Sequence, residues 1–125
     1  MVRFITTKEL GEFIPKLVEL ERSYFGDQAF NESQVRYWWE ARRFFFSGTL
    51  DPETGKMRSS MSMLLIDEDN YRTLQKGAHE ADMVPYRIAS RKVGYLYLGG
   101  MIIDDKHHTP FMYHKICKDV VQCAQ

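Results

Sequence analysis

The stretch Leu96–Lys115, LYLGGMIIDDKHHTPFMYHK, decides how the rest of the chain is interpreted, because it contains an apolar run, a charged turn and the expected start of a helix. A strand that runs into a helix N-terminus is a place where proteins often bind phosphates. Gly99 and Gly100 interrupt the apolar run and weaken a strand. We therefore expect a β-bulge there, or a close approach by a backbone or a ligand; a crowded core contact would explain the pair equally well.

Upstream of this stretch, the spacing of hydrophobic residues predicts several short helices and strands. Capping boxes precede two helices, and Pro15 breaks the first of these helices or kinks it. A turn-forming segment, 51–56, joins two strands in a hairpin. The expected elements are strand Val2–Ile5, capping boxes Thr6–Glu9 and Asn31–Gln34, hairpin strands Phe44–Leu50 and Met57–Ile66, a short helix after Asp67 or Asp69, strand Lys92–Ile103 and a final helix near 110–121.

This order of elements predicts an α+β fold with a mostly antiparallel sheet, since it does not repeat a βαβ unit. In the second hairpin strand, we expect Met57, Met61, Met63 and Leu65 to form an apolar face opposite a mostly polar one. The aromatic stretch 37–46 predicts a core helix that runs into a buried strand, with Arg42 and Arg43 exposed to solvent.

Composition excludes several classes of protein. The 125 residues suit one domain, 1–125, and the 17 basic residues equal the 17 acidic ones. Such a balance argues against a dedicated nucleic-acid binder, although Arg42, Arg43, Arg91 and Lys92 would be the residues to test for one. No signal pattern and no apolar run of membrane-spanning length occurs. Cys117 and Cys123 are expected to be reduced, so we expect a cytoplasmic protein without membrane association.

Histidine and cysteine near the C-terminus raise the question of a metal site. His107, His108, His114 and Cys117 lie close together in the sequence. Their spacing fits no standard zinc pattern, and there is no second pair at finger spacing. The sequence therefore predicts no metal.

The segment Met101–Lys106, MIIDDK, resembles the strand end and acidic turn of the GCN5-related N-acetyltransferases. Glu80–Asp82 and Tyr95–Leu98 are similar to the approach to that strand in some bacterial members. The resemblance covers the whole chain loosely and the strand-turn-helix segment more sharply. It implies a mixed, mostly antiparallel sheet flanked by helices.

The resemblance also implies an activity and its residues. A family member would transfer an acetyl group from acetyl-coenzyme A to an amine of a small molecule or peptide. Substrate-side candidates are Glu21, Tyr24 and Phe25, which could equally be a solvated carboxylate and two packing aromatics. No catalytic residue can be named, because glycines stand where the family often places an acid. The candidate cosubstrate-binding residues are Met101, Ile102, Ile103, His108, Thr109, Phe111, Met112 and Tyr113.

Two departures from the family leave alternatives open. His108, Phe111 and Tyr113 stand where the family has an Arg or Gln and two glycines that admit phosphate. The family's sheet also continues with three further strands. The chain could therefore be the N-terminal two-thirds of a full domain, a shortened relative, or a sheet completed by a partner, including a second copy in a homodimer. The alternative function is a non-catalytic binding or assembly module that has lost the phosphate loop.

Overall fold

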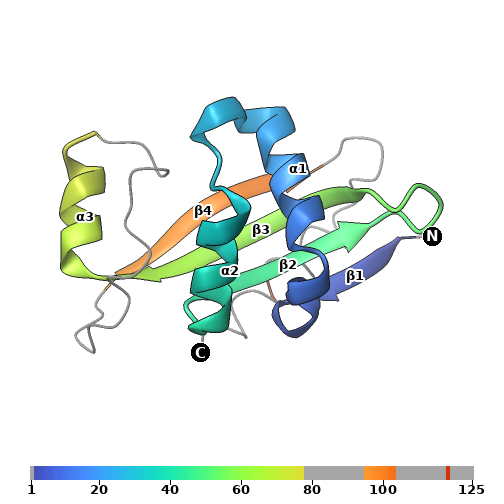
Figure 1. The fold of residues 1–125 in the computed structure, drawn as a ribbon, viewed down its shortest axis with the longest axis horizontal. Coiled ribbons are helices and arrows are strands. Elements are labelled where there is room, and N and C mark those ends of the chain that lie inside the picture. Colours follow the sequence, from blue (N-terminus) through green and yellow to red (C-terminus); the bar gives the residue numbers. More distant parts are fainter. Residues whose placement is uncertain (1, 78–94, 104–117, 119–125) are drawn as a thin grey trace.

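A computed structural model describes residues 2–77, 95–103 and 118. Within these residues, the sheet has 4 strands, and every neighbouring pair is antiparallel. The spatial order β1-β2-β3-β4 equals the order along the chain (Figure 1). The predicted α+β class with an antiparallel sheet is confirmed. The strands are β1 Arg3–Thr6, β2 Phe44–Leu50, β3 Met57–Ile66 and β4 Tyr95–Ile103.

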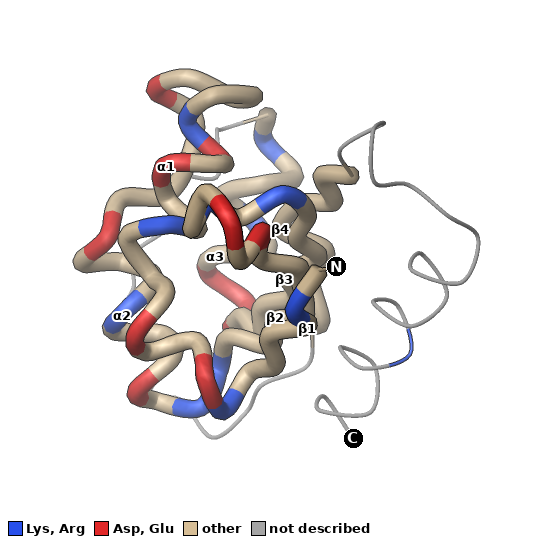
Figure 2. Tube along the Cα trace, turned by 90° about the vertical axis from the view of Figure 1, so that its right-hand side faces the viewer, with Lys and Arg blue, Asp and Glu red and all other residues tan. Residues whose placement is uncertain are grey.

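Two helices cover one face of this sheet. Figure 1 shows α1 and α2 side by side across the strands, and α3 at the end of the sheet where β4 begins. The end-on view of Figure 2 places α1 and α2 to the same side of the strands. The expected final helix lies outside the described residues except for Lys118, which is helical, so helices on both faces stay a prediction. The helices are the 3-10 segments η1 Thr7–Glu12 and η2 Gly26–Gln28, and the α-helices α1 Ile14–Phe25, α2 Glu32–Glu40 and α3 Glu68–Gln75.

Side-chain caps fix where the helices begin. The Asn31 side chain accepts a hydrogen bond from the Gln34 N–H at 2.8 Å, and the Gln34 side chain accepts one from the Asn31 N–H at 3.1 Å. This reciprocal pair is the predicted capping box. Pro15 lies in the first turn of α1, where no intrahelical N–H bond is lost, and it follows the separate 3-10 segment η1. The predicted break at this proline is therefore confirmed.

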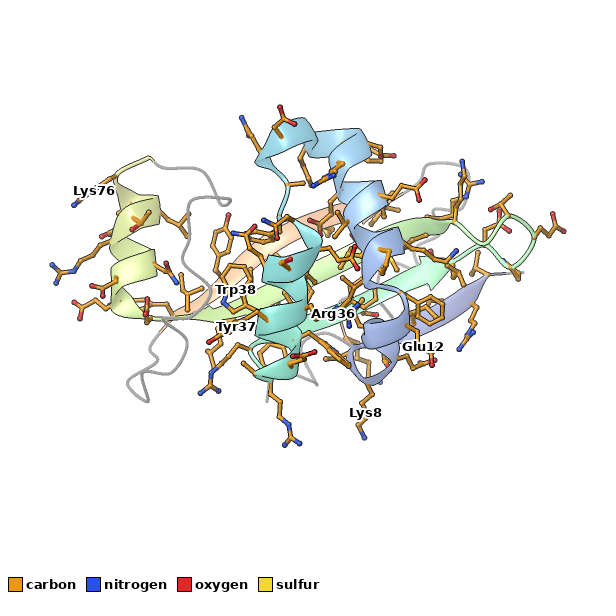
Figure 3. All side chains as sticks on the ribbon, in the orientation of Figure 1. Lys8, Glu12, Arg36, Tyr37, Trp38 and Lys76 are labelled. Carbon is orange, nitrogen blue, oxygen red and sulfur yellow. The ribbon has the colours of Figure 1, made fainter. Side chains whose placement is uncertain are left out.

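The main core lies between α1, α2 and the sheet. Trp38 is fully buried beneath α2 (Figure 3) and packs edge-on against Phe30, with ring centroids 5.1 Å apart. Phe44 and Phe46 of β2 are also fully buried. The interpretation of the aromatic stretch as a core helix that runs into a buried strand is confirmed. Of its two arginines, Arg42 is exposed as expected, whereas Arg43 is only partly exposed.

The predicted polar and apolar faces of β3 are wrong in two respects. Met57 belongs to the main core beneath the helices, whereas Met61 belongs to a second cluster with Phe4, Phe45 and Met63. A register irregularity between Thr49 and Leu50 of the partner strand separates the two methionines. Such a bulge shifts the alternation of side chains. In addition, the supposedly polar face is buried, since Ser60 and Ser62 are 2% and 1% exposed.

Candidate functional site

The glycine pair of β4 forms a β-bulge. Ser62 of β3 pairs with Gly100 and Met63 pairs with Leu98, so Gly99 is the extra residue on β4. A Cβ atom placed on Gly99 would lie 3.2 Å from the Ser62 Oγ and 3.3 Å from the Leu64 Cδ1. Both distances are tighter than ordinary contacts of real Cβ atoms. The glycine is thus explained by a bulge together with a crowded side-chain contact.

The C-terminal end of α1 brings an aromatic ring to this bulge. A Cβ atom on Gly100 would lie 3.6 Å from the Phe25 Cε2, which is an ordinary van der Waals distance. Phe25 itself is 43% exposed, so one part of its ring contacts the strand and another part faces solvent. α1 ends at once, because Gly26 follows with a φ of +61°. The predicted substrate-side residue Phe25 and the glycine pair are therefore neighbours in space.

β4 is also the outermost strand of the sheet within the described residues. A strand at the edge of a sheet presents backbone N–H and C=O groups that the ladder does not use. The extra residue of a bulge adds a further interruption in the hydrogen-bond pattern. The bulge can therefore offer main-chain donors and acceptors to a ligand that lies along this edge.

The other two substrate-side candidates lie elsewhere on α1. Glu21 is only 5% exposed and takes part in an interaction, so it is not a solvated carboxylate. Tyr24 is 59% exposed and lines a separate cavity of about 280 Å³, together with Lys16, Lys56 and Arg58. Consecutive helical residues point about 100° apart. Tyr24 and Phe25 therefore belong to different surfaces.

The predicted cosubstrate-binding residues are only partly described. Ile102 is 3% exposed and lies opposite Ser60, whereas Met101 is 43% exposed and lies opposite Met61. Successive side chains of a strand point to opposite faces of the sheet, so the side chains of Met101 and Ile102 cannot line the same surface of a binding site. The candidates of the loop and final helix lie outside the described residues: His108, Thr109, Phe111, Met112 and Tyr113.

Sequence reasoning missed Ser62, whose hydroxyl lies against the bulge. It belongs to a set of small hydroxyl side chains that the two central strands bury. Thr49 and Ser59 hydrogen-bond to each other through their hydroxyls, and the buried Ser47 Oγ has no partner among the described residues. Alternating serines normally indicate a solvated strand face. The signal that could have identified Ser62 was its place in the hairpin strand Met57–Ile66, which pairs with the strand that contains the glycine pair.

Comparison with models of known protein families finds no match to this sequence, and comparison with curated proteins finds none either. Across residues 2–77 and 95–103, no three His, Cys, Asp or Glu side chains gather in a way that could hold a metal ion. No helix in the same part of the chain combines the length and apolar character that a bilayer crossing requires.

Proposed function

We propose that the chain is an acyltransferase-like protein of the GCN5-related N-acetyltransferase type, which transfers an acetyl group from acetyl-coenzyme A to an amine. The observation that carries the proposal is the bulge at Gly99 on the outermost described strand, with Phe25 packed over Gly100. The proposal rests on this geometry together with the resemblance of Met101–Lys106 to the end of the corresponding family strand.

The bulge suits the chemistry of acyl transfer. As a free amine adds to the thioester carbonyl carbon, negative charge develops on the carbonyl oxygen. A backbone N–H released from the ladder can donate to that oxygen. The C–N bond then forms, the C–S bond breaks, coenzyme A leaves as the thiolate, and the amine's extra proton passes to water or to a base.

The edge of β4, which is outermost among the described strands, suits the rest of the cosubstrate. The pantetheine arm of coenzyme A carries two amide groups, and an extended amide chain can hydrogen-bond along an exposed strand edge as an added strand would. Phe25 would then line the side of the site from which the acceptor amine approaches the thioester. The acceptor is an amine of a small molecule or a peptide.

Thermal stability in the presence of coenzyme A tests this proposal. A ligand at about 100 times its Kd stabilises the folded state by roughly 2.7 kcal/mol, so Tm should rise by several degrees. Phe25→Ala should reduce acetyl transfer to a panel of amines, whereas Tyr24→Ala is the matched control, because Tyr24 is the neighbouring exposed aromatic on a different surface. No Tm shift with millimolar coenzyme A or acetyl-coenzyme A would contradict the enzyme proposal.

A second candidate function is a non-catalytic assembly module. The observation in its favour is an exposed apolar stripe on β4, where Leu96, Leu98 and Met101 are 47%, 48% and 43% exposed. Their partners on β3 place all three on the face opposite α1 and α2. A second copy of the chain would cover such a stripe in a homodimer. This function takes the place of the first if coenzyme A produces no Tm shift.

A further inference from the structure

A separate cavity lies where η1 meets the connection from α2 to β2. Its volume is about 720 Å³, which falls in the range of small-molecule sites. Trp39 on the helix side of the sheet and Phe45 on its other face supply apolar surface, and Lys8, Glu40 and Arg42 supply charge. None of these residues belongs to the bulge of β4. Figure 3 shows Lys8 projecting outward at this edge of the molecule.

The apolar wall of the cavity is held in place before any ligand arrives. The Trp39 indole N–H donates to the Thr7 carbonyl oxygen at 2.7 Å, which ties α2 to η1. A Cβ atom on Gly11 would lie 2.5 Å from the Trp39 ring, so only glycine lets the indole pack this closely. The polar atom of Trp39 is therefore satisfied, and the rest of the half-buried ring offers a fixed apolar surface. A preorganised surface of this kind costs little ordering when it binds.

The charges around the cavity do not balance. Lys8 and Arg42 are exposed cations, and neither has an ion-pair partner in the part of the chain that the structure describes. Glu40 is the single acidic residue that lines the cavity within the described residues. Two cations against one carboxylate favour a ligand that carries an anionic group, and the aromatic surface favours a ligand that also has an apolar part.

The backbone of Arg42 provides an independent observation. Its φ of +61° makes it the one non-glycine residue with a positive φ within the described residues, where the other three such positions are Gly26, Gly55 and Gly77. Arg42 follows Ala41, the C-cap of α2, at the position that helices usually give to glycine. A side chain in this conformation is strained. Strained backbone of this kind concentrates at binding sites.

We propose that this cavity binds a small amphipathic organic anion. Its apolar body lies against Trp39, and its carboxylate faces Lys8 and Arg42. Glycine at position 42 would relieve the backbone strain, but it would also remove a cation from the cavity. Binding of an anion therefore explains why an arginine occupies this strained position. The site does not depend on the acyltransferase proposal, since it shares no residue with the bulge.

The Trp39 indole N–H resonance in a ¹H–¹⁵N NMR spectrum reports on this cavity directly, and a Trp39→Phe variant assigns it. Octanoate is the probe, and octylammonium is its matched control with the same chain and the opposite charge. Octanoate should shift the resonance saturably, whereas octylammonium at equal concentration should not. Binding of both ions with equal affinity, or no saturable shift with octanoate, overturns the proposal.

Single substitutions distinguish an effect of charge on octanoate binding from an effect on folding. Arg42→Gly should weaken octanoate binding about fivefold, as expected for an exposed charge pair, while Tm rises by a few degrees. Lys8→Ala should also weaken binding, and it keeps the test open if Arg42→Gly folds poorly. Lys76→Ala is the control, because this exposed lysine lies beyond α3 at the far end of the molecule (Figure 3). Unchanged affinity in both Arg42→Gly and Lys8→Ala would contradict the proposal.

Discussion

Replacing Gly48, the glycine inside β2, with alanine should destabilise the protein, because the added methyl group would meet atoms that are already in place. Gly48 lies in β2 between Ile5 of β1 and Ser60 of β3. An added Cβ atom would lie 2.4 Å from the Ser59 carbonyl oxygen and 2.6 Å from the Phe46 Cζ. The carbonyl oxygen belongs to the backbone of β3, which the sheet pairs on both sides. It cannot move away as the end of a flexible side chain could.

The size of the effect follows from two opposing terms. Overpacking a well-packed core costs about 1–3 kcal/mol. Replacing a glycine in a strand offsets roughly 0.5–1 kcal/mol of this overpacking cost, because the unfolded chain of the variant has less conformational freedom to lose on folding. Since the added methyl group meets both a backbone atom and a fully buried ring, the cost should lie in the upper part of its range. The net loss is about 2 kcal/mol, or roughly 8 °C in Tm for a domain of this size.

Thermal and urea unfolding would measure this loss. Gly77→Ala is the control, because an added Cβ there meets nothing within 4 Å and only its φ of +85° resists the substitution. Backbone strain of that kind costs about 1 kcal/mol. A Gly48→Ala variant as stable as the wild type, or no less stable than Gly77→Ala, would refute the steric reasoning.

Two further predictions concern the helix starts. Asn31→Ala removes one half of the capping box of α2 and should lower stability by about 1 kcal/mol in urea unfolding, whereas Asn31→Ser should retain most of it. Burial raises the pKa of Glu9, but hydrogen bonds from Arg3 and Thr6 outweigh it and hold the pKa below its ordinary value of 4.5. Ionised Glu9 therefore stabilises the fold above about pH 4.5, and this stabilisation is lost as the pH falls through the folded pKa of Glu9. The difference in Tm between the wild type and Glu9→Gln should accordingly shrink in acid. A difference in Tm that stays constant with pH would contradict this prediction.

Features that depend on neighbouring residues could be predicted from the sequence. The capping box Asn31–Gln34 and both hairpin strands have the predicted bounds, because turn-forming residues and side-chain caps act over a few positions. The bulge was one of the explanations that the sequence offered for Gly99 and Gly100, and the other, a crowded contact, also holds for Gly99.

Features that depend on how distant segments meet could not be predicted. Met57 faces the helices because the pairing of β2 with β3 shifts near Leu50, and single-strand alternation does not contain that shift. The contact of Phe25 with Gly100 depends on where α1 ends above β4. The aromatic stretch did not show that Arg42 would take a positive φ at the end of α2 and line a cavity.

The order of strands in the sheet affects how the fold can be assembled. Each described strand lies beside the one that precedes it in the chain. During synthesis from the N-terminus, β1 is therefore complete before its partner β2 is made, and β3 follows β2 after the turn 51–56. Hairpins with such short loops close within microseconds, far faster than a ribosome adds the next residue. Growth proceeds at one edge only, so none of these strands has to be inserted between two that are already paired.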